Sequence, residues 1–138
     1  MLGDFTKYLE ITHQQYDIVM CSGVLYHMED PIALISSISR VTSNCFVWTH
    51  YYDQMNYPGP MRETRSDPRY PGVPLYTLPN KDMGCGQFWG GNRSVAVWLS
   101  REDLLQSFIK AGLTSIDIID ERPHHPNGAA LTFAASRR

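Results

Sequence analysis

Residues 16–31 read Tyr16-Asp-Ile-Val-Met-Cys-Ser-Gly-Val-Leu-Tyr-His-Met-Glu-Asp-Pro31. The apolar first half is typical of a buried strand, and the glycine after it predicts a tight turn. Asp30 and Pro31 then form a helix start, because aspartate is a preferred cap and proline is favoured in the first helical turn. A buried strand that delivers polar side chains at its carboxyl end is where open α/β sheets bind ligands. The sequence therefore predicts a site at Tyr26 and His27.

Outside this stretch, local patterns predict three further strands and two helices. Apolar residues recur at three- and four-residue spacing in both helices, and the second helix has a serine cap before it and Gly112 after it. The strand near the end of the chain alternates large apolar residues with smaller or polar ones. The predicted strands are residues 17–22, 44–52, 115–120 and 129–135, and the predicted helices are residues 31–41 and 100–111.

The stretch Asp17-Ile-Val-x-Cys-Ser-Gly-Val-Leu-Tyr-His-x-x-Asp-Pro31 resembles the fourth-strand region of class I S-adenosylmethionine (SAM) dependent methyltransferases. Its Gly-Val-Leu-Tyr-His form is most similar to the branch that modifies the wobble uridine of tRNA. The resemblance implies an α/β fold with an incomplete Rossmann-like sheet, made of the family's fourth, fifth, seventh and sixth strands. It also implies two main helices, a long insertion after the second strand, and a last strand that lies antiparallel between its two predecessors.

Methyltransferases of this class begin with a strand, a Gly-rich turn and a helix that bind the methionine part of SAM. Nothing before Tyr16 has room for these elements. We therefore expect residues 1–138 to be a single partial domain that lacks the amino-terminal SAM-binding half. Such a chain would bind SAM weakly or not at all and would be inactive alone. The stretch Gly84-Cys-Gly-Gln-Phe-Trp-Gly-Gly91 does not replace the missing turn, because no apolar strand precedes it and no helix start follows.

The resemblance also implies contacts to the cofactor. Asp4 and Phe5 fall where related enzymes meet the adenine, although a frayed chain end is the alternative and the interpretation we favour for this chain. Tyr26 would point its hydroxyl at the donor. Cys21 and Ser22 would line the cleft, largely through backbone groups.

Methyl transfer from a sulfonium requires mainly alignment of the nucleophile, and a base only when the acceptor must lose a proton. His27 is the first candidate for this base, with Tyr26 beside it, because the turn after the fourth strand faces the methyl cleft in this class. The alternative is that His27 caps or packs against the next helix. His50 and Tyr52 end the second strand at the same edge and are candidate acceptor contacts. For His50 a structural role is the stronger expectation.

Residues 53–97 hold six of the nine prolines and six of the ten glycines, and they show no sustained periodicity. A connection of this length inside a compact domain is usually functional or disordered. We interpret it as an insertion that forms a substrate lid, with packing or an oligomer contact as the alternative. Arg62, Trp89 and Arg93 are its candidate acceptor contacts.

Composition narrows the class of protein. The formal net charge of −2 gives no basic footprint for a nucleic-acid backbone. Cys21, Cys45 and Cys85 are widely spaced, which predicts free thiols in a reducing, cytoplasmic setting and no zinc site. A hydrolase that pairs Cys21 with His27 or His50 is disfavoured, because no orienting acid is evident. No apolar run approaches the length of a membrane span.

Two functions from different classes fit these residues. The first is the carboxyl-terminal part of a SAM-dependent methyltransferase that acts on a small molecule, such as a sugar or another metabolite, or else on tRNA. The second is a non-catalytic fragment that serves as an interaction module. Without the amino-terminal strands, the flank of residues 17–22 is an open edge, which favours pairing with another chain and hence a homo-oligomer.

Overall fold

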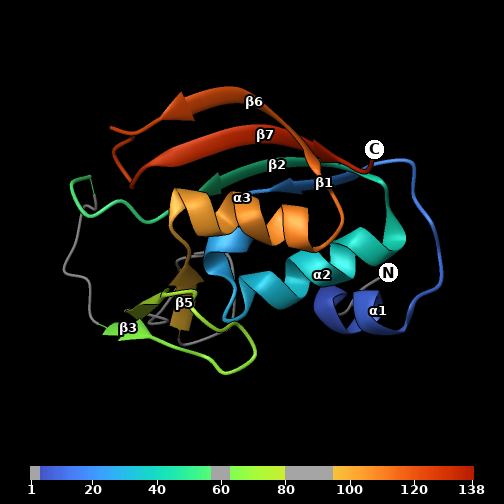
Figure 1. Ribbon diagram of the computed structural model, residues 1–138, viewed down its shortest axis with the longest axis horizontal. Helices are drawn as coiled ribbons and strands as arrows, with labels where there is room; N and C mark the ends of the chain where they lie inside the picture. Colours follow the sequence, from blue (N-terminus) through green and yellow to red (C-terminus); the bar gives the residue numbers. More distant parts are fainter. Residues whose placement is uncertain (1–3, 57–62, 80–94) are drawn as a thin grey trace, which may run out of the picture.

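A four-stranded mixed sheet forms the centre of the protein (Figure 1). The computed structural model describes residues 4–56, 63–79 and 95–138. The strand order is β1-β2-β7-β6, with β1 parallel to β2 and with β7 antiparallel to both β2 and β6. The prediction that the last strand lies between its two predecessors is therefore confirmed. The strands are β1 (Val19–Ser22), β2 (Asn44–His50), β6 (Ser115–Arg122) and β7 (Ala130–Ser136).

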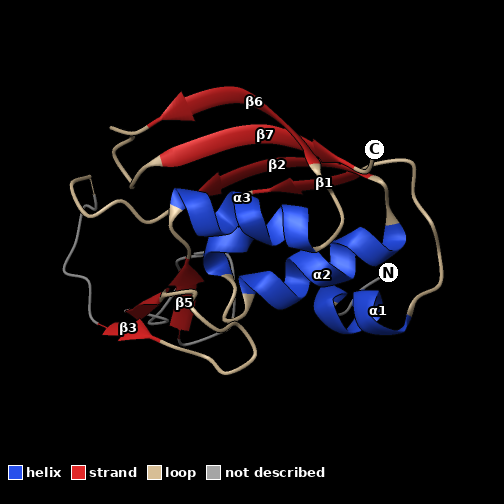
Figure 2. Cartoon of the chain, in the orientation of Figure 1, coloured by secondary structure: helices blue, strands red, loops and turns tan. Residues whose placement is uncertain are grey.

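Helices α2 (Pro31–Val41) and α3 (Arg101–Lys110) cover one face of this sheet (Figure 2). Asp30 caps α2 by accepting a hydrogen bond from the main-chain N–H of Ala33 at 2.9 Å. Alternate residues of the strands point toward the helices and form the core. Its fully buried members include Ile35, Val47, Phe108 and Phe133. No helix in the described part of the chain is long and apolar enough to cross a membrane.

The other face of the sheet carries the intervening residues of each strand. Met20 pairs with Phe46, and Val47 on the helix side pairs with Phe133, so the register assigns the two sets to opposite faces. The side chain of Met20 is 70% exposed. The helices drawn in Figure 1 all lie on the first face. The described residues therefore leave an apolar sheet face uncovered, next to the edge strand β1.

The amino-terminal residues form a helix, α1 (Phe5–Ile11), which adds to the two predicted helices. Asp4 caps it by accepting a hydrogen bond from the N–H of Thr6 at 3.0 Å. The guanidinium of Arg40 in α2 donates to the carbonyl of Leu9 at 2.6 Å and ties the helix down. The expectation of a frayed end is therefore wrong for residues 4–11.

Part of the 53–97 segment forms a second, antiparallel sheet with strand order β3-β4-β5, which the sequence did not predict. Its strands are only three to five residues long, too short for a periodic pattern to stand out. Leu75, Val97 and Leu99 nevertheless belong to the same core as the main sheet. The described parts of the segment thus pack as an extension of that core, and a lid function remains a prediction. The strands are β3 (Glu63–Arg65), β4 (Leu75–Pro79) and β5 (Val95–Trp98).

Candidate functional site

The turn after β1 carries the predicted site residues. Gly23 has a φ of 73°, a conformation that favours glycine, and its N–H donates to the carbonyl of Trp48 at 2.9 Å. A short 3-10 helix, η1 (Leu25–His27), follows. Leu25 is buried in the core, whereas Tyr26 and His27 are half-buried. Because β1 and β2 are parallel, their carboxyl ends meet at one sheet edge. The turn therefore delivers Tyr26 and His27 beside the end of β2.

Six aromatic side chains meet at this edge, and we call them the aromatic cluster: Tyr26, His27, Trp48, His50, Trp98 and His125. The ring centroid of Tyr26 lies 4.7 Å from that of His50 and 4.1 Å from that of His27. Trp98 stacks on His50 at 5.3 Å with nearly parallel planes, and His125 lies 5.0 Å from His50. The ring of His50 is therefore the hub of the cluster.

His50 has the most defined geometry in the cluster. Its side chain is largely buried, with the residue 6% exposed, and its Nδ1 lies 2.8 Å from the carbonyl oxygen of Gly128 and 3.3 Å from that of Ala129. A carbonyl oxygen can only accept, so Nδ1 must carry the proton. Burial lowers the pKa of His50 below 6.5, and nearby His125 lowers it further, while the two carbonyl contacts act in the opposite direction. His50 is thus a neutral imidazole at pH 7 whose Nε2 lone pair accepts no hydrogen bond from a described residue.

Tyr26 and His27 are held less firmly. No residue in the described ranges forms a hydrogen bond with the hydroxyl of Tyr26 or with the ring of His27. Burial raises the pKa of Tyr26, so its hydroxyl stays protonated and can donate. Burial also lowers the pKa of His27, with a smaller contribution from the charge of His50. No contact in the described part of the chain selects one tautomer of His27.

Cys21 and Ser22 lie on opposite faces of β1. Cys21 pairs with Val47 and is 3% exposed in the core, where burial raises its thiol pKa to about 12. Its side chain cannot reach the aromatic cluster, so only its backbone could line a cleft. Ser22 is exposed on the face that carries Trp48. A protonated thiol buried on the far side of the sheet from His50 also argues against a Cys–His hydrolase.

Of the remaining predicted contacts, Tyr52, Asp4 and Phe5 are described, and none of these three belongs to the cluster. Tyr52 lies between the two sheets, with its ring 3.8 Å from that of Tyr76 and its N–H bonded to the carbonyl of Leu99 at 2.8 Å. Asp4 and Phe5 begin α1, where the Asp4 carboxylate serves as the helix cap. Their adenine role stays a prediction. Arg62, Trp89 and Arg93 lie outside the described residues, as does Cys85.

Three members of the cluster were missed as site residues. Trp48 was assigned to an apolar run in a strand, Trp98 was given no site role, and for His125 a structural role was the stronger expectation. The alternation of Phe46, Trp48 and His50 along one strand was the signal that could have placed Trp48 and His50 on a common face. His124 lies apart, with its Nδ1 bonded to the side-chain oxygen of Asn56 at 2.7 Å.

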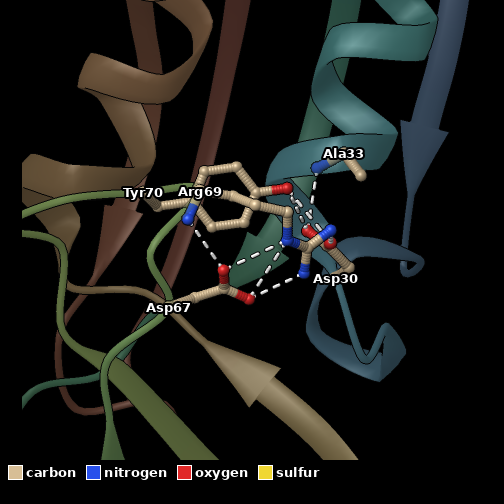
Figure 3. Close-up of polar contacts among 5 residues, drawn as sticks. All are labelled: Asp30, Ala33, Asp67, Arg69 and Tyr70. Atoms are coloured by element: carbon tan, nitrogen blue, oxygen red, sulfur yellow. Dashed lines mark hydrogen bonds and ion pairs between the residues drawn. The ribbon is translucent and has the colours of Figure 1, made fainter.

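A polar link fastens residues 67–70 to the start of α2, as Figure 3 shows. Asp30 accepts hydrogen bonds from the hydroxyl of Tyr70 at 2.9 Å and forms an ion pair with Arg69 at 2.8 Å. Asp67 also pairs with Arg69 at 2.7 Å, and this contact lowers the pKa of Asp67 to about 2. Because two carboxylates neutralise Arg69, it is no free cation for an acceptor. The link anchors the second sheet region three residues after His27.

A cleft of about 280 Å³ opens beside this link, between α2, α3 and residues 69–73. Its lining includes Ile32, Tyr70 and Lys110. The cleft lies against the helices, on the side of the sheet opposite His50. This cleft is therefore separate from the aromatic cluster. Within the described ranges, no group of three or more acidic, histidine or cysteine residues is arranged to hold a metal ion.

Known proteins resemble this chain in structure only. No protein-family model and no curated protein sequence matches it. The solved N-terminal domain of EvdMO1, in the presence of S-adenosylhomocysteine (SAH) and D-fucose, aligns with a TM-score of 0.69 at 22% identity, over 94% of this chain and 52% of that one. The same domain with SAH bound aligns equally well, over 51% of its length. The longer EvdMO1 structure gives a TM-score of 0.55 at 21% identity, over 94% of this chain and 24% of that one.

These alignments show that the chain has the α/β fold of the matched SAH-bound domain and spans about half of that domain's length. Identities near 22% establish the fold alone. The three structures lend no support to the tRNA-modifying branch that the turn sequence resembles.

Proposed function

We propose that this chain is the carboxyl-terminal part of a SAM-dependent methyltransferase that acts on a hydroxyl group of a small, sugar-like acceptor. The observation that carries the proposal is the meeting of Tyr26 and His50 at the carboxyl ends of two parallel strands. Ligands of open α/β sheets bind at this kind of edge. The matched EvdMO1 domain was solved with SAH and with D-fucose, which supports a nucleoside donor and a neutral sugar as probes.

The described residues offer hydrogen-bonding groups for part of such a donor. SAM supplies an activated methyl group on a sulfonium. The protonated hydroxyl of Tyr26 can donate a hydrogen bond to the donor, and the turn at Ser22 and Gly23 offers backbone groups at the strand end. A hydroxyl acceptor must also lose a proton, and His27 and His50 both stand in the aromatic cluster to receive it. tRNA is the second acceptor class, and the net charge of −2 makes it the weaker one.

The test is a titration of the isotopically labelled chain with SAH, followed by nuclear magnetic resonance (NMR). We expect weak binding, because about half of the matched domain has no counterpart here. Amide shifts should nevertheless concentrate at residues 22–27 and at His50. A Tyr26→Phe variant should weaken the response, while Tyr16→Phe, which removes a hydroxyl before β1, should not. Shifts that are absent at millimolar SAH, or that fall on β6 instead, would contradict the proposal.

A second candidate function is self-association through the open edge of the main sheet. β1 is an edge strand, and Ile18 and Met20 along it are 57% and 70% exposed. An exposed apolar edge is a template for another strand, and two copies related by a two-fold axis would pair β1 antiparallel to its mate. A homo-oligomer of this kind would need no SAM.

Analytical ultracentrifugation at tens of micromolar tests this second candidate. The unmodified chain should sediment as a dimer or larger species, and Met20→Lys should release monomers. Ile119→Lys is the matched control, because Ile119 is 55% exposed on β6 at the opposite edge. A well-behaved monomer for the unmodified chain excludes self-association.

A further inference from the structure

We propose that His50, through its Nε2, accepts the proton of an acceptor hydroxyl, and that the aromatic cluster selects a neutral, hydroxylated ring as that acceptor. The inference rests on the proposed function and specifies its acceptor and its base. It assigns the base to the end of β2 rather than to His27 in the turn after β1.

The first argument is the fixed orientation of the imidazole. The carbonyls of Gly128 and Ala129 hold Nδ1–H from one side, and Trp98 stacks on one face of the ring. A neutral histidine held by Nδ1–H presents Nε2 as an acceptor. The ring of His27 has no hydrogen bond to a described residue that would select its tautomer. A base must be held in the correct tautomer, and of the two histidines only His50 meets this condition.

The second argument is access to Nε2. No hydrogen bond is formed at Nε2 of His50 by any described residue. Yet every fully buried side-chain nitrogen or oxygen in the described part of the chain has a partner. Nε2 must therefore keep some contact with solvent, even though the residue as a whole is 6% exposed.

The third argument is the side from which a ligand can approach. The void beside His50 on the helix side of the sheet has about 10 Å³, which is room for no more than one water molecule. An acceptor therefore cannot reach His50 from the interior. His50 and Trp48 share the sheet face that the described helices leave uncovered, where the rings of Tyr26 and His125 flank them. The acceptor must enter along this face.

The composition of the cluster defines the acceptor. Its rings come from η1, β2, β5 and the loop before β7, and neither a carboxylate nor a cation contacts the His50 ring among the described residues. Apolar walls with a few convergent polar atoms are typical of sites for neutral small molecules. A charged acceptor would lose its hydration there without gaining a charged partner among the described residues. A sugar ring meets the requirement, since its C–H faces pack on aromatic rings and its hydroxyls reach Tyr26 and His50.

The proton balance of the step is complete. The acceptor oxygen forms the new O–C bond to the methyl group, the S–C bond of the donor breaks with its electron pair left on sulfur, and the hydroxyl proton passes to Nε2. The resulting imidazolium is stabilised by the carbonyls of Gly128 and Ala129, which already face Nδ1–H. The groups that face His50 and bear on its titration are His27 from η1, His125 from the loop before β7, and Tyr26.

The test begins with histidine-detected ¹⁵N NMR of the full chain, which reads tautomer and titration without any catalysis. His50 should show the Nδ1–H tautomer and titrate below pH 6.5. Addition of SAH with D-fucose as the hydroxyl probe should shift Nε2 of His50 more than either ring nitrogen of His27. An Nε2–H tautomer, or a larger response at His27, would overturn the assignment.

Two matched variants complete the test. His50→Asn keeps an amide that can donate to Gly128 but has no Nε2, and it should lose the D-fucose response, whereas His27→Asn should keep it. Release of SAH from SAM and D-fucose should fall at least about a hundredfold in His50→Asn, as expected for loss of a general base. Equal losses in both variants would refute the proposal. If the unmodified chain releases no SAH, as expected of a chain that is inactive alone, the NMR response of the two variants decides whether His50 binds the hydroxyl, whereas absence of SAH-induced shifts at residues 22–27 would count against the proposed function.

Discussion

The indole Nε1 of Trp98 donates a hydrogen bond to the main-chain carbonyl of Tyr26 at 3.0 Å, although 72 residues separate them. The next contact along β5 repeats the link, since the N–H of Val97 donates to the carbonyl of Met28 at 2.8 Å. The last strand of the second sheet thus holds the middle residue of η1 and the residue that caps its carboxyl end. The position of Tyr26 in the aromatic cluster therefore depends on the segment that the sequence marked only as an insertion.

Replacement of Trp98 by phenylalanine should destabilise the protein and loosen Tyr26. The change removes the indole donor and leaves the carbonyl of Tyr26 without it, which costs about 1–3 kcal/mol when the acceptor stays buried. Urea denaturation measures the loss. Trp48→Phe is the matched control, because the Trp48 indole forms no hydrogen bond with a described residue. An equal loss in both variants would show that ring packing, and not the hydrogen bond, holds the turn.

Replacement of Asp30 should separate its two roles. Asp30→Ala removes both the α2 cap and the link to Arg69, and loss of a cap costs about 0.5–2 kcal/mol. Asp30→Asn keeps a good capping side chain and removes only the charge. It should have a much smaller effect, because solvent screens the exposed ion pair. Thermal unfolding of the two variants makes the comparison, and a large loss in Asp30→Asn would mean that the ion pair dominates.

Stability should fall on mild acidification. Burial lowers the folded-state pKa of His50 below the ordinary value of 6.5, and that of His27 as well. Between the two pKa values the unfolded chain binds more protons than the folded one. The contribution is therefore fully present above pH 6.5 and is lost as the pH falls toward the folded-state pKa. Urea midpoints from pH 8 to pH 5 should show this slope.

His50→Asn should reduce the dependence of the urea midpoint on pH, and the dependence that remains should come from His27. The control is His13→Asn, which replaces an exposed histidine in the connection before β1. An unchanged slope in His50→Asn would mean that folding does not lower the pKa of the His50 imidazole, contrary to the effect expected of its burial.

The thiols of Cys21 and Cys45 should be inert while the protein is folded. Both are free and buried, and burial raises the pKa of each to about 12. In a Cys85→Ser variant, which leaves only these two, a thiol reagent such as Ellman's should react negligibly under native conditions. Both thiols should react after unfolding in guanidinium. Fast reaction of one thiol in the folded state would contradict this prediction and would again allow Cys21 to be considered as a nucleophile.

Local signals predicted most of the main sheet. Helix α2 has the predicted bounds because the capping residue Asp30 and the first helical residue Pro31 define its start, and both act within one helical turn. The sequence did not predict the second sheet, because its strands are separated by Pro- and Gly-rich connections and are too short for a periodic pattern to stand out. The local signal for helix α1 was weak, in part because the helix is held by Arg40, which lies 31 residues from Leu9 in the sequence.

The sequence by itself determined the strand, the glycine turn and the capped helix that bring Tyr26 and His27 to a sheet edge, since those steps depend on neighbours a few residues apart. Only the tertiary structure decided that His50 is the centre of the aromatic cluster. Its proton is placed by the carbonyl of Gly128, 78 residues away, and its ring is stacked by Trp98 from the second sheet. Contacts between segments so distant in the chain produce no periodic pattern in the sequence. The local pattern around each partner is the same whether or not the other partner is present.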